Sequence, residues 1–372
     1  MSGLVVHEAV DKRDRLLFVR FPWSVYRENP YWVPPLVREC LAKISSAHPF
    51  YAHADAAFFI ARQEGRIVGR IAAIIDQNYI RIHNSKTGFF GFFEAFSEPR
   101  IASALLETAR CWLKERGMES MIGPMSPSTN DECGLLLDGF DTSPCFMMPY
   151  NPPYYASMLE NFGLCKARDL YAYRIEQSLF DFRKVEILAR HLQKKKPALT
   201  ARPVAMASFG EDLQTVKEIY NQAWSENWGF VPITDAEIDL LANRLKPLIV
   251  PGLCLFAHWG EKPVGFSLTL PDYNIALKRL NGRAGLLGKI RFYFLARNIR
   301  SCRVMLLGVT RTFRRRGVEA MLLLETVRHA LSLGYNCAEC SWILEDNELI
   351  RRTIESLGGQ RYKTYRIYSM DI

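Results

Sequence analysis

The sequence predicts an α+β protein of two tandem domains, each a mixed, mostly antiparallel twisted sheet flanked by helices. Three observations support this prediction. A strand-like segment with a Gly-containing turn occurs twice, at residues 58–69 and 255–265. The stretch Leu-Leu-Glu-Thr-Ala-Arg at 105–110 returns as Leu-Leu-Glu-Thr-Val-Arg at 323–328. Each copy then reaches a glycine and a Tyr-rich strand, ending near residues 175 and 368.

The chain of 372 residues divides into two domains joined by a helical linker. A chain of this length is long for a single hydrophobic core and is typical of a protein with two domains. The repeats place the first domain at residues 1–176 and the second at 201–372. Between them, residues 177–200 contain apolar side chains at helical spacing, followed by a Lys-Lys-Lys-Pro stretch. We therefore expect a linker helix in this segment.

Turn signals and helix stops define the elements within each copy. Residues 63–66 (Gln-Glu-Gly-Arg) and 260–263 (Gly-Glu-Lys-Pro) lie between alternating apolar stretches, a pattern typical of β-hairpins. Helices are predicted from about 100 to 116 and from about 317 to 333. Both carry Leu and Ala at i, i+3 and i+4, and both end at a glycine. A strand at 337–344, a short helix and a last strand complete the second copy.

The composition is that of an ordinary globular protein, with 49% hydrophobic and 23% charged residues. No apolar run approaches the ~18–20 residues of a membrane span. The first fourteen residues are charged and lack the apolar stretch of a signal peptide. Nine scattered cysteines suit a reducing compartment, so we expect a cytoplasmic protein. The Cys-Ala-Glu-Cys run at 337–340 has no second pair, so no metal site is expected.

Positive charge is concentrated in residues 273–318, which contain 12 Lys and Arg and no Asp or Glu. Because the whole chain carries +9, the remainder is net negative. Residues 278–303, which we interpret as a loop, mix bulky apolar with basic side chains, as segments resting on anionic membranes do. A nucleic-acid groove could look similar, but no DNA- or RNA-binding motif accompanies it. We expect peripheral contact with the inner face of the cytoplasmic membrane, and no nucleic acid.

An anion-binding loop is predicted in the second copy only. An aliphatic strand at 304–309 is followed by the run 314–317, Arg-Arg-Arg-Gly, and then by a helix. The start of a helix presents unpaired amides and the positive end of its dipole, and a glycine lets phosphate oxygens approach. The first copy has an acid and a proline, Glu98 and Pro99, at the equivalent place. One working site in a two-domain body is therefore expected.

This order of elements resembles the GNAT superfamily of acyl-CoA N-acyltransferases, whose pattern Q/R-x-x-G-x-G/A holds the coenzyme A pyrophosphate. Arg314 and Gly317 match the pattern, whereas Glu319 stands where Gly or Ala is usual. The resemblance implies acyl-CoA as co-substrate and no permanently bound cofactor. The residues it implies for the thioester are Leu307, Gly308, Val309, Arg314, Arg315, Arg316, Gly317, Val318, Glu319, Ala320 and Asn347.

The expected reaction needs a base for the acceptor amine and allows an acid for the leaving thiolate. An amine with a pKa near ~10 is mostly protonated at neutral pH, so a carboxylate within hydrogen-bond reach should remove a proton. Glu339 is the first candidate base and Glu345 the second. Many superfamily members have a Tyr acid where Ile354 stands. Tyr362 or Tyr365 could replace it, or the thiolate leaves without help.

Motifs along the full length resemble a bacterial GNAT-like family that includes the bacterial ceramide synthases. They include Gly-Phe-Phe-Gly-Phe-Phe-Glu at 88–94, Asn-Asp-Glu-Cys-Gly at 130–134 and Trp-Gly-Phe-Val-Pro at 228–232. The resemblance implies transfer of a fatty acyl group to a sphingoid-type, lipidic amine. The candidate acceptor-binding residues are Asn130, Glu132, Trp228 and Trp342.

Two alternatives remain open at this point. One is an acetyl- or aminoacyl-transferase acting on a small-molecule or peptidoglycan amine, although the long charged heptad arm of many peptidoglycan-type enzymes is missing. The other is a non-catalytic nucleic-acid-binding protein on a GNAT fold, which would bind duplexes in a steeply salt-dependent way.

Overall fold

The computed structural model describes residues 3–179, 182–283 and 285–372, and the chain divides into two compact units. Unit 1 comprises Met1–Leu170, Ala276–Phe292 and Lys363–Ile372, and unit 2 comprises Tyr171–Ile275 and Tyr293–Tyr362. Most of the C-terminal strand, from Lys363 on, and residues 276–292 thus group with unit 1, and the domain bounds 1–176 and 201–372 stay a prediction from the repeats. Residues 1–2 of the expected first domain and residues 180–181 of the expected linker helix lie outside the described residues.

Unit 1 contains a sheet in the order β1-β2-β3-β4-β5-β15. All neighbours pair antiparallel except β4 and β5, which run parallel. The β2–β3 hairpin turns at Glu64 and Gly65, whose φ angles of 51° and 75° give the left-handed turn that hairpins favour. The strands are β1 Leu4–Glu8, β2 Ala54–Gln63, β3 Arg66–Asp76, β4 Thr87–Ala95, β5 Ser120–Gly123 and β15 Gln360–Asp371.

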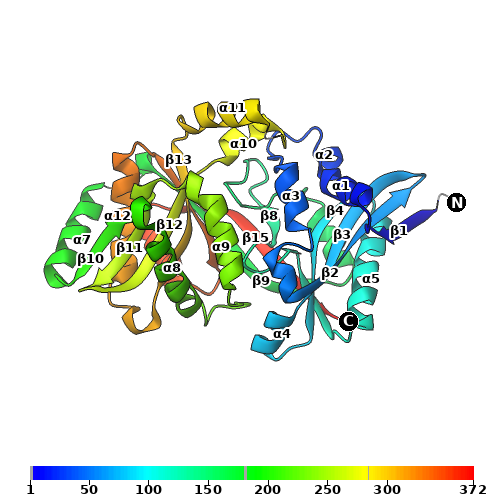
Figure 1. Ribbon diagram of the computed structural model, residues 1–372, viewed down its shortest axis with the longest axis horizontal. Coiled ribbons are helices and arrows are strands. Elements are labelled where there is room, and N and C mark those ends of the chain that lie inside the picture. The colour runs from blue at the N-terminus through cyan, green and yellow to red at the C-terminus, as the bar shows by residue number, and fades with distance from the viewer. Residues whose placement is uncertain (1–2, 180–181, 284) are drawn as a thin grey trace. The chain divides into compact units, whose positions relative to one another are not determined.

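Helix α5, Pro99–Glu115, supplies the main helical layer of unit 1 and packs on β2, β3 and β4 (Figure 1). Its Leu105, Leu106 and Ala109 are fully buried, which explains the apolar face seen in the sequence. The shorter elements of the unit are α1 Lys12–Arg20, α2 Pro22–Val25, α3 Val37–Lys43, α4 Gln77–His83, α6 Tyr155–Asn161, β6 Met125–Ser126, β7 Glu132–Cys133 and β8 Leu135–Asp138.

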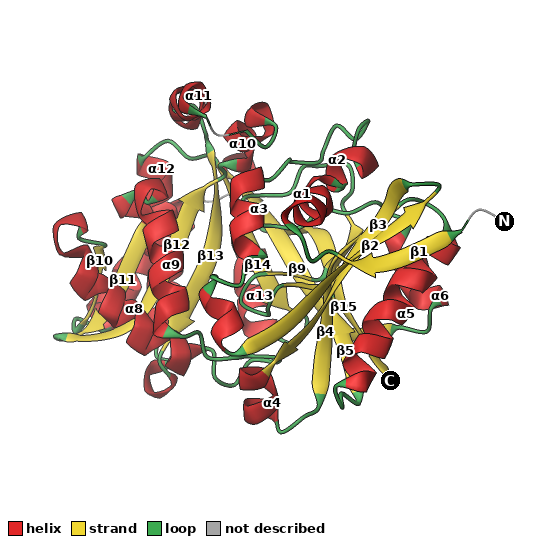
Figure 2. Ribbon diagram, turned by 45° about the vertical axis from the view of Figure 1, so that its right-hand side comes forward, coloured by secondary structure: helices red, strands yellow, loops and turns green. Residues whose placement is uncertain are grey.

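Unit 2 repeats this arrangement, with strand order β10-β11-β12-β13-β14. Its neighbours are again antiparallel except for the last pair, β13 and β14, which is parallel. The α+β prediction of two tandem units with mixed sheets is therefore confirmed (Figure 2). The strands are β10 Leu199–Pro203, β11 Cys254–Trp259, β12 Lys262–Pro271, β13 Ser301–Val309 and β14 Cys337–Leu344; β9, Cys165–Glu176, begins in unit 1 and ends in unit 2.

Helices cover both faces of the unit 2 sheet. Leu255 and Ala257 of β11 pack with α12, Val318–Ser332, while Cys254 and Phe256 pack with α8, Phe209–Ala223. Because successive side chains of a strand point to opposite faces, these helices lie on opposite sides. The other helices of unit 2 are α7 Phe182–Lys195, α9 Asp235–Leu245 and α13 Glu348–Ser356, while α10 Asn274–Leu280 and α11 Leu286–Ala296 lie mostly in the residues 276–292 that belong to unit 1. No helix in the described chain is both long and apolar enough for a bilayer span.

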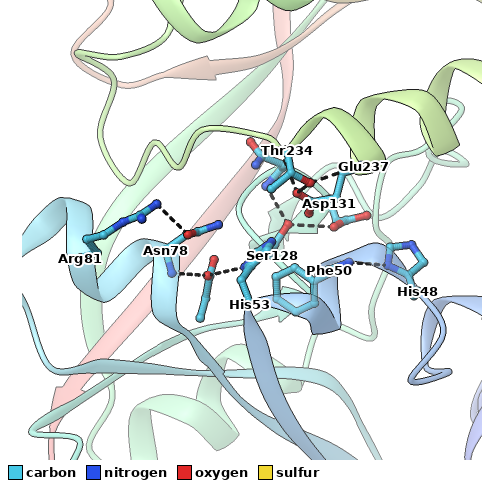
Figure 3. A network of polar contacts seen from close by, with 11 residues as sticks. His48, Phe50, His53, Asn78, Arg81, Ser128, Asp131, Thr234 and Glu237 are labelled. Carbon is cyan, nitrogen blue, oxygen red and sulfur yellow. Dashed lines mark hydrogen bonds and ion pairs between the residues drawn. The ribbon is translucent and has the colours of Figure 1, made fainter.

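Residues 278–303, expected as a loop, instead contain the end of α10 and the whole of α11. The Leu, Lys and Arg residues of this stretch have good helix propensity, which favours helix over loop. Some of the helices begin with a residue whose side chain caps the first turn, and α9 is an example. At α9, Thr234 Oγ1 accepts from the Glu237 amide at 3.3 Å, and the Glu237 carboxylate accepts from the Thr234 amide at 2.9 Å (Figure 3).

An ion pair stabilises the first turn of α8. Asp212 has a 5% exposed side chain and accepts from Arg202 Nη2 at 2.5 Å and from the Ala205 amide at 2.7 Å. Burial raises the pKa of the Asp212 carboxyl, but the hydrogen bond from Arg202 and the other favourable contacts outweigh it and leave the pKa below its ordinary value.

We expect Asp212→Asn to destabilise the protein by about 2 kcal/mol at pH 7, since it weakens a charged, buried hydrogen-bond acceptor. A depressed folded-state pKa stabilises the fold above the unfolded pKa of about 4, and this contribution is lost as the pH falls through the folded value. Chemical denaturation at pH 7 and pH 3 checks both points. The difference between wild type and variant should shrink at the lower pH, and an equal difference would contradict this role.

Candidate functional site

The basic loop after β13 adopts a geometry suited to anion binding. Arg315 and Gly317 both have left-handed backbones, with φ of 58° and 87°. Backbone of this kind turns successive amides toward one side, which is how anion-binding concavities form. Helix α12 begins directly afterwards, and no side chain of the described residues caps it at Gly317. The first amides of α12, through Ala320, therefore remain available to an external acceptor.

Neighbouring elements of unit 2 hold this loop in place. Arg314 Nη1 donates to Glu226 Oε2 at 2.9 Å, and its other nitrogen donates to the carbonyl of Ala223 at the end of α8. The Lys196 ammonium donates to the Arg316 carbonyl. The sequence had implied that Arg314 contacts the phosphates. Its side chain instead fastens the loop to α8.

A pocket of about 290 Å³ opens beside the loop, entirely within unit 2. It lies where β13 and β14 separate, because their parallel pairing ends at Val304 and Cys340. A bulge opposite Leu268 and Thr269 leaves Met305 as an extra residue in β13, and Met305 lines the pocket. Much of the remaining wall is apolar, including Leu307, Leu323, Ile343, Leu344, Ile350 and Ile354.

The edge of β13 facing this gap carries backbone groups that no strand of the described chain pairs. The Thr310 amide donates to the Val264 carbonyl on β12 at 2.9 Å. Because antiparallel residues alternate in direction, the amides of Leu307 and Val309 point away from β12. Gly308 between them lies against Trp224, whose ring atom Cη2 would be 2.3 Å from an added Cβ. A glycine is needed here for this close approach.

Trp342 presents a hydrogen-bond donor at the pocket. It lies on the pocket wall, and its Nε1 is buried with no hydrogen-bond partner among the described residues. The Arg303 guanidinium lies 5.4 Å from the centre of its ring. A buried indole N–H normally finds a partner, so this donor is suited to a carbonyl of a bound ligand.

Glu339 lies in a buried network next to the pocket but is not on its wall. Its Oε1 accepts from Ser341 Oγ at 2.5 Å and lies 3.5 Å from Arg303 Nε, and its other oxygen accepts from the Tyr362 hydroxyl. Arg303 Nε also donates to Ser341 Oγ at 2.9 Å. Both charged side chains are nearly fully buried, 2% and 3% exposed. Ser341 does line the pocket and so connects it to the carboxylate.

The structure brings together only part of the residues suggested by the sequence. Those that line the pocket are Leu307, Arg315, Gly317, Glu319, Ala320, Trp342 and Asn347. Asn347 Oδ1 also accepts from the Ile350 amide at 3.4 Å, so it caps α13 as well. Arg314, Arg316, Gly308, Val309, Val318, Glu339, Glu345 and Trp228 belong to unit 2 but are not among the lining residues.

Three further candidates belong to unit 1. Tyr365 is fully buried and pairs with Leu136 across β15 and β8. Glu132 lies 3.7 Å from the Lys43 ammonium, and the Asn130 amide donates to Ser128 Oγ, which in turn donates to Asp131 (Figure 3). The sequence analysis missed Trp224, Asn227, Met305 and Ser341 on the pocket wall. Met305 and Ser341 could have been placed on the pocket wall only if the register of the strands had been known.

The corresponding gap in unit 1 is filled by the chain itself. Strands β4 and β5 pair only up to Phe89 and Ile122 before they separate. A Cβ on Gly91 would lie 1.5 Å from the Met125 carbonyl oxygen, so β6 occupies the space against β4. The helix that follows, α5, starts with Pro99, which has no amide hydrogen. Unit 1 therefore has no open gap between its two parallel strands. The helix that follows also lacks one of the N-terminal amides that α12 has in unit 2.

Cys340 is a potential nucleophile on the pocket wall, but its environment opposes ionisation. Burial, and then the neighbouring Glu339 carboxylate, raise the pKa of the Cys340 thiol to about 12. The thiol therefore stays protonated at neutral pH, and thiolate is the reactive form.

We expect Cys340→Ala to keep kcat within about threefold of the wild type, since a protonated thiol is a poor nucleophile and we expect no covalent intermediate on it. Mass spectrometry of the intact protein, quenched during turnover, should show no added acyl mass. A stable acyl adduct at Cys340, or loss of activity in a folded Cys340→Ala variant, would contradict this expectation.

Two named proteins resemble the chain over nearly its whole length. The bacterial ceramide synthase of Caulobacter vibrioides is 35% identical over 360 residues, which cover 94% of this chain and 93% of that protein. Protein YghO of Escherichia coli is 35% identical over 374 residues, which cover 99% of this chain and 95% of that protein. No family model matches the chain.

Solved structures with similar folds include proteins named as GNAT or GCN5-related N-acetyltransferases. The tandem GNAT protein from the clavulanic acid biosynthesis pathway superposes with a TM-score of 0.60, covering 99% of this chain and 98% of that one at 12% identity. A GCN5-related N-acetyltransferase from Sphaerobacter thermophilus gives a TM-score of 0.52, with 99% and 95% coverage and 12% identity. At such low identity, the likeness concerns the fold.

Proposed function

Because the chain belongs to the tandem GNAT N-acyltransferases, in the family that includes the bacterial ceramide synthase, we propose that it transfers a fatty acyl group from coenzyme A to a sphingoid-type amine. GNAT folds typically use acyl-CoA as co-substrate. The observation that carries the proposal is the uncapped start of α12 beside an apolar pocket in the same unit.

The coenzyme A diphosphate is proposed to bind the amides of Arg315 and of residues 317–320, since the Arg316 amide already donates to the Phe313 carbonyl at 3.4 Å. Two left-handed residues and the positive end of the α12 dipole favour an anion there. The pantetheine arm would then extend along the unpaired edge of β13, where the amides of Leu307 and Val309 can pair with its amide groups. Asn347, at the start of α13, lies on the same pocket and is proposed to contact this arm.

The acyl group is proposed to lie against the apolar wall between β13 and β14. Burial of each methylene is worth about 0.8 kcal/mol, so such a wall favours long chains over acetyl. The thioester carbonyl would accept from a backbone amide of β13 and from Trp342 Nε1, the buried donor described above. Both donors would strengthen their hydrogen bonds as negative charge develops on that oxygen.

The chemistry is proposed to be direct attack of the amine on the thioester. The amine nitrogen forms a bond to the carbonyl carbon, and the carbon–sulfur bond breaks with its electron pair on sulfur. The extra proton on nitrogen passes to Ser341 Oγ, whose own proton moves to Glu339 Oε1, 2.5 Å away. Glu339 is thus the proposed base, acting through Ser341, and Glu345 remains the second candidate.

No acid is required for the leaving group in this scheme. A free thiol has a pKa of about 8.5, so coenzyme A can leave as the thiolate near neutral pH. Tyr365 is fully buried in unit 1 and is not a pocket residue, so we do not retain it as the proposed acid.

Turnover with defined substrates tests this proposal. The purified full-length protein is incubated with acyl-CoAs of several lengths and either sphinganine or the water-soluble amine glucosamine. Free thiol and amide product are followed together. We expect long-chain acyl-CoA and sphinganine to give the highest kcat/KM. Turnover with acetyl-CoA alone, or with glucosamine in preference to sphinganine, would refute the lipid assignment and favour the alternative acyl transfer to a small polar amine.

A further inference from the structure

Helix α11, Leu286–Ala296, is rich in apolar side chains, and several of them are largely exposed in the described chain. None of its residues is buried. Leu286 and Leu287 are 78% and 82% exposed, and Phe294 is 61% exposed. A helix rich in apolar side chains is normally buried in a core or against a partner, so its exposure requires an explanation.

The most exposed apolar side chains of α11 share one face, whereas Phe292 and Leu295 lie on the other side and are half-buried. At about 100° per residue, Leu286, Leu287, Ile290 and Phe294 form a stripe roughly 100° wide. On the same count, Lys289 lies just beyond one edge of the stripe and Arg291 just beyond the other. Both cations are exposed. An apolar stripe between two rows of cations is the arrangement of a helix that lies in a membrane interface.

The charge around α11 is of one sign only. Residues 273–318 contain 12 Lys and Arg and no acid, so nothing in this stretch neutralises the cations at the helix. Lys and Arg next to a lipid-facing stripe are attracted to anionic headgroups, whereas a complementary protein surface would have to present acids around an apolar groove. Charge complementarity therefore favours an anionic bilayer as the occupant.

The chain just before α11 is firmly attached to unit 1. Trp23 Nε1 donates to Asn281 Oδ1 at 3.0 Å, and the Val37 amide donates to the Gly282 carbonyl at 3.2 Å. A Cβ on Gly282 would lie 2.4 Å from the Trp23 ring, which shows how closely the two segments approach. Because residues 286–292 of α11 belong to the same unit, a membrane contact made by them would be transmitted to a folded unit.

We infer that α11 is a membrane-docking helix that inserts its Leu286–Phe294 stripe between anionic lipid headgroups. The inference deepens the proposed function, because a sphingoid amine resides in a bilayer and the enzyme would meet it there. It does not depend on turnover, since docking needs neither acyl-CoA nor amine.

Co-sedimentation of the full-length protein with phosphatidylglycerol/phosphatidylcholine vesicles tests this inference. We expect Leu287→Glu with Phe294→Glu to lower the partition coefficient at least tenfold, roughly the effect of placing two charges in the apolar stripe. The matched control is Val5→Glu with Val10→Glu, which adds the same charge at two other exposed apolar positions, 58% and 71% exposed. This control should bind as the wild type does.

A second pair of variants separates charge from apolar insertion. Lys289→Gln with Arg291→Gln should weaken binding to anionic vesicles while leaving the weak binding to pure phosphatidylcholine unchanged. Absence of wild-type binding to anionic vesicles, or undiminished binding by the Leu287/Phe294 variant, would overturn the inference. So would a wild-type dimer that this variant converts to monomer without any vesicle binding, because a second copy would then cover α11.

The two proposals fail in distinguishable ways. Turnover of a short acyl-CoA with a water-soluble amine should be the same in the α11 variants and the wild type. A protein that turns over substrate but binds no vesicles keeps the proposed function and loses the docking helix. A protein that binds vesicles through α11 but transfers no acyl group keeps the helix and loses the function.

Discussion

Replacing Gly317 by alanine is expected to weaken coenzyme A binding by about 100-fold or more. Gly317 has a φ of 87°, a conformation that costs a residue with a Cβ roughly 1–2 kcal/mol. An added Cβ would also lie 2.9 Å from Leu192 Cδ1. The loop must shift to relieve both, and each charged hydrogen bond it loses costs about 1.5–3 kcal/mol. Calorimetric titration of the full chain with coenzyme A measures the change.

The other end of the same helix provides the matched control. Gly334 follows α12 with a φ of 82°, and its nearest neighbour, Arg300 Nη1, would be 3.5 Å from an added Cβ. Gly334→Ala therefore imposes similar backbone strain without touching the proposed anion site. Both variants should unfold at lower temperatures, and only Gly317→Ala should lose coenzyme A affinity. Equal affinities in the two variants would remove Gly317 from the binding site.

Replacing Glu339 by glutamine is expected to lower kcat by about 10²–10⁴-fold, the usual worth of a positioned base. The amide cannot take the proton that Ser341 passes on, so the rate should fall while the KM for acyl-CoA changes little. The loss should be partly recovered at high pH, where more of the amine is already deprotonated. Steady-state kinetics across pH measure all three quantities.

Two further variants test whether a loss of kcat in Glu339→Gln has a purely structural cause. Ser341→Ala removes the link between pocket and carboxylate, and it should reproduce the loss in kcat. Asp212→Asn neutralises another buried, ion-paired carboxylate of unit 2 away from the pocket, and its kcat should stay near the wild-type value. If Glu339→Gln lowers stability but keeps its kcat, the network with Arg303 is structural and Glu345 becomes the leading candidate.

Much of the fold could be predicted because local signals agree with the tertiary arrangement. The hairpin turn at Glu64-Gly65 and the glycines that end α5 and α12 act through their own backbone conformations. The repeated Leu-Leu-Glu-Thr stretch marks the same face of both helices, and each packs on its sheet. Such features depend on a few neighbouring residues, which is why the α+β tandem arrangement was recognised.

The features that the sequence did not reveal depend on distant pairing. The last strand, β15, has the same alternating pattern whichever sheet it joins, and its antiparallel pairings with β5 and β8 assign most of it to unit 1. Residues 276–292 belong to unit 1 through contacts with Trp23 and Pro35 that local propensity cannot encode.

The candidate site, too, has some features that could be predicted from the sequence and others that depend on distant pairing. The phosphate loop could be found because its residues are consecutive. The Arg303–Glu339 pair requires the register in which these residues lie opposite each other on β13 and β14, and a one-residue slip would separate them. The buried donor of Trp342 likewise becomes evident only when its surroundings are known.

A crystal structure of the full chain with bound coenzyme A tests the central claim most directly. We expect the diphosphate oxygens within hydrogen-bond distance of the amides of Arg315 and of residues 317–320, and the pantetheine arm along the free edge of β13. Coenzyme A bound in unit 1, or bound elsewhere with these amides unoccupied, would contradict it.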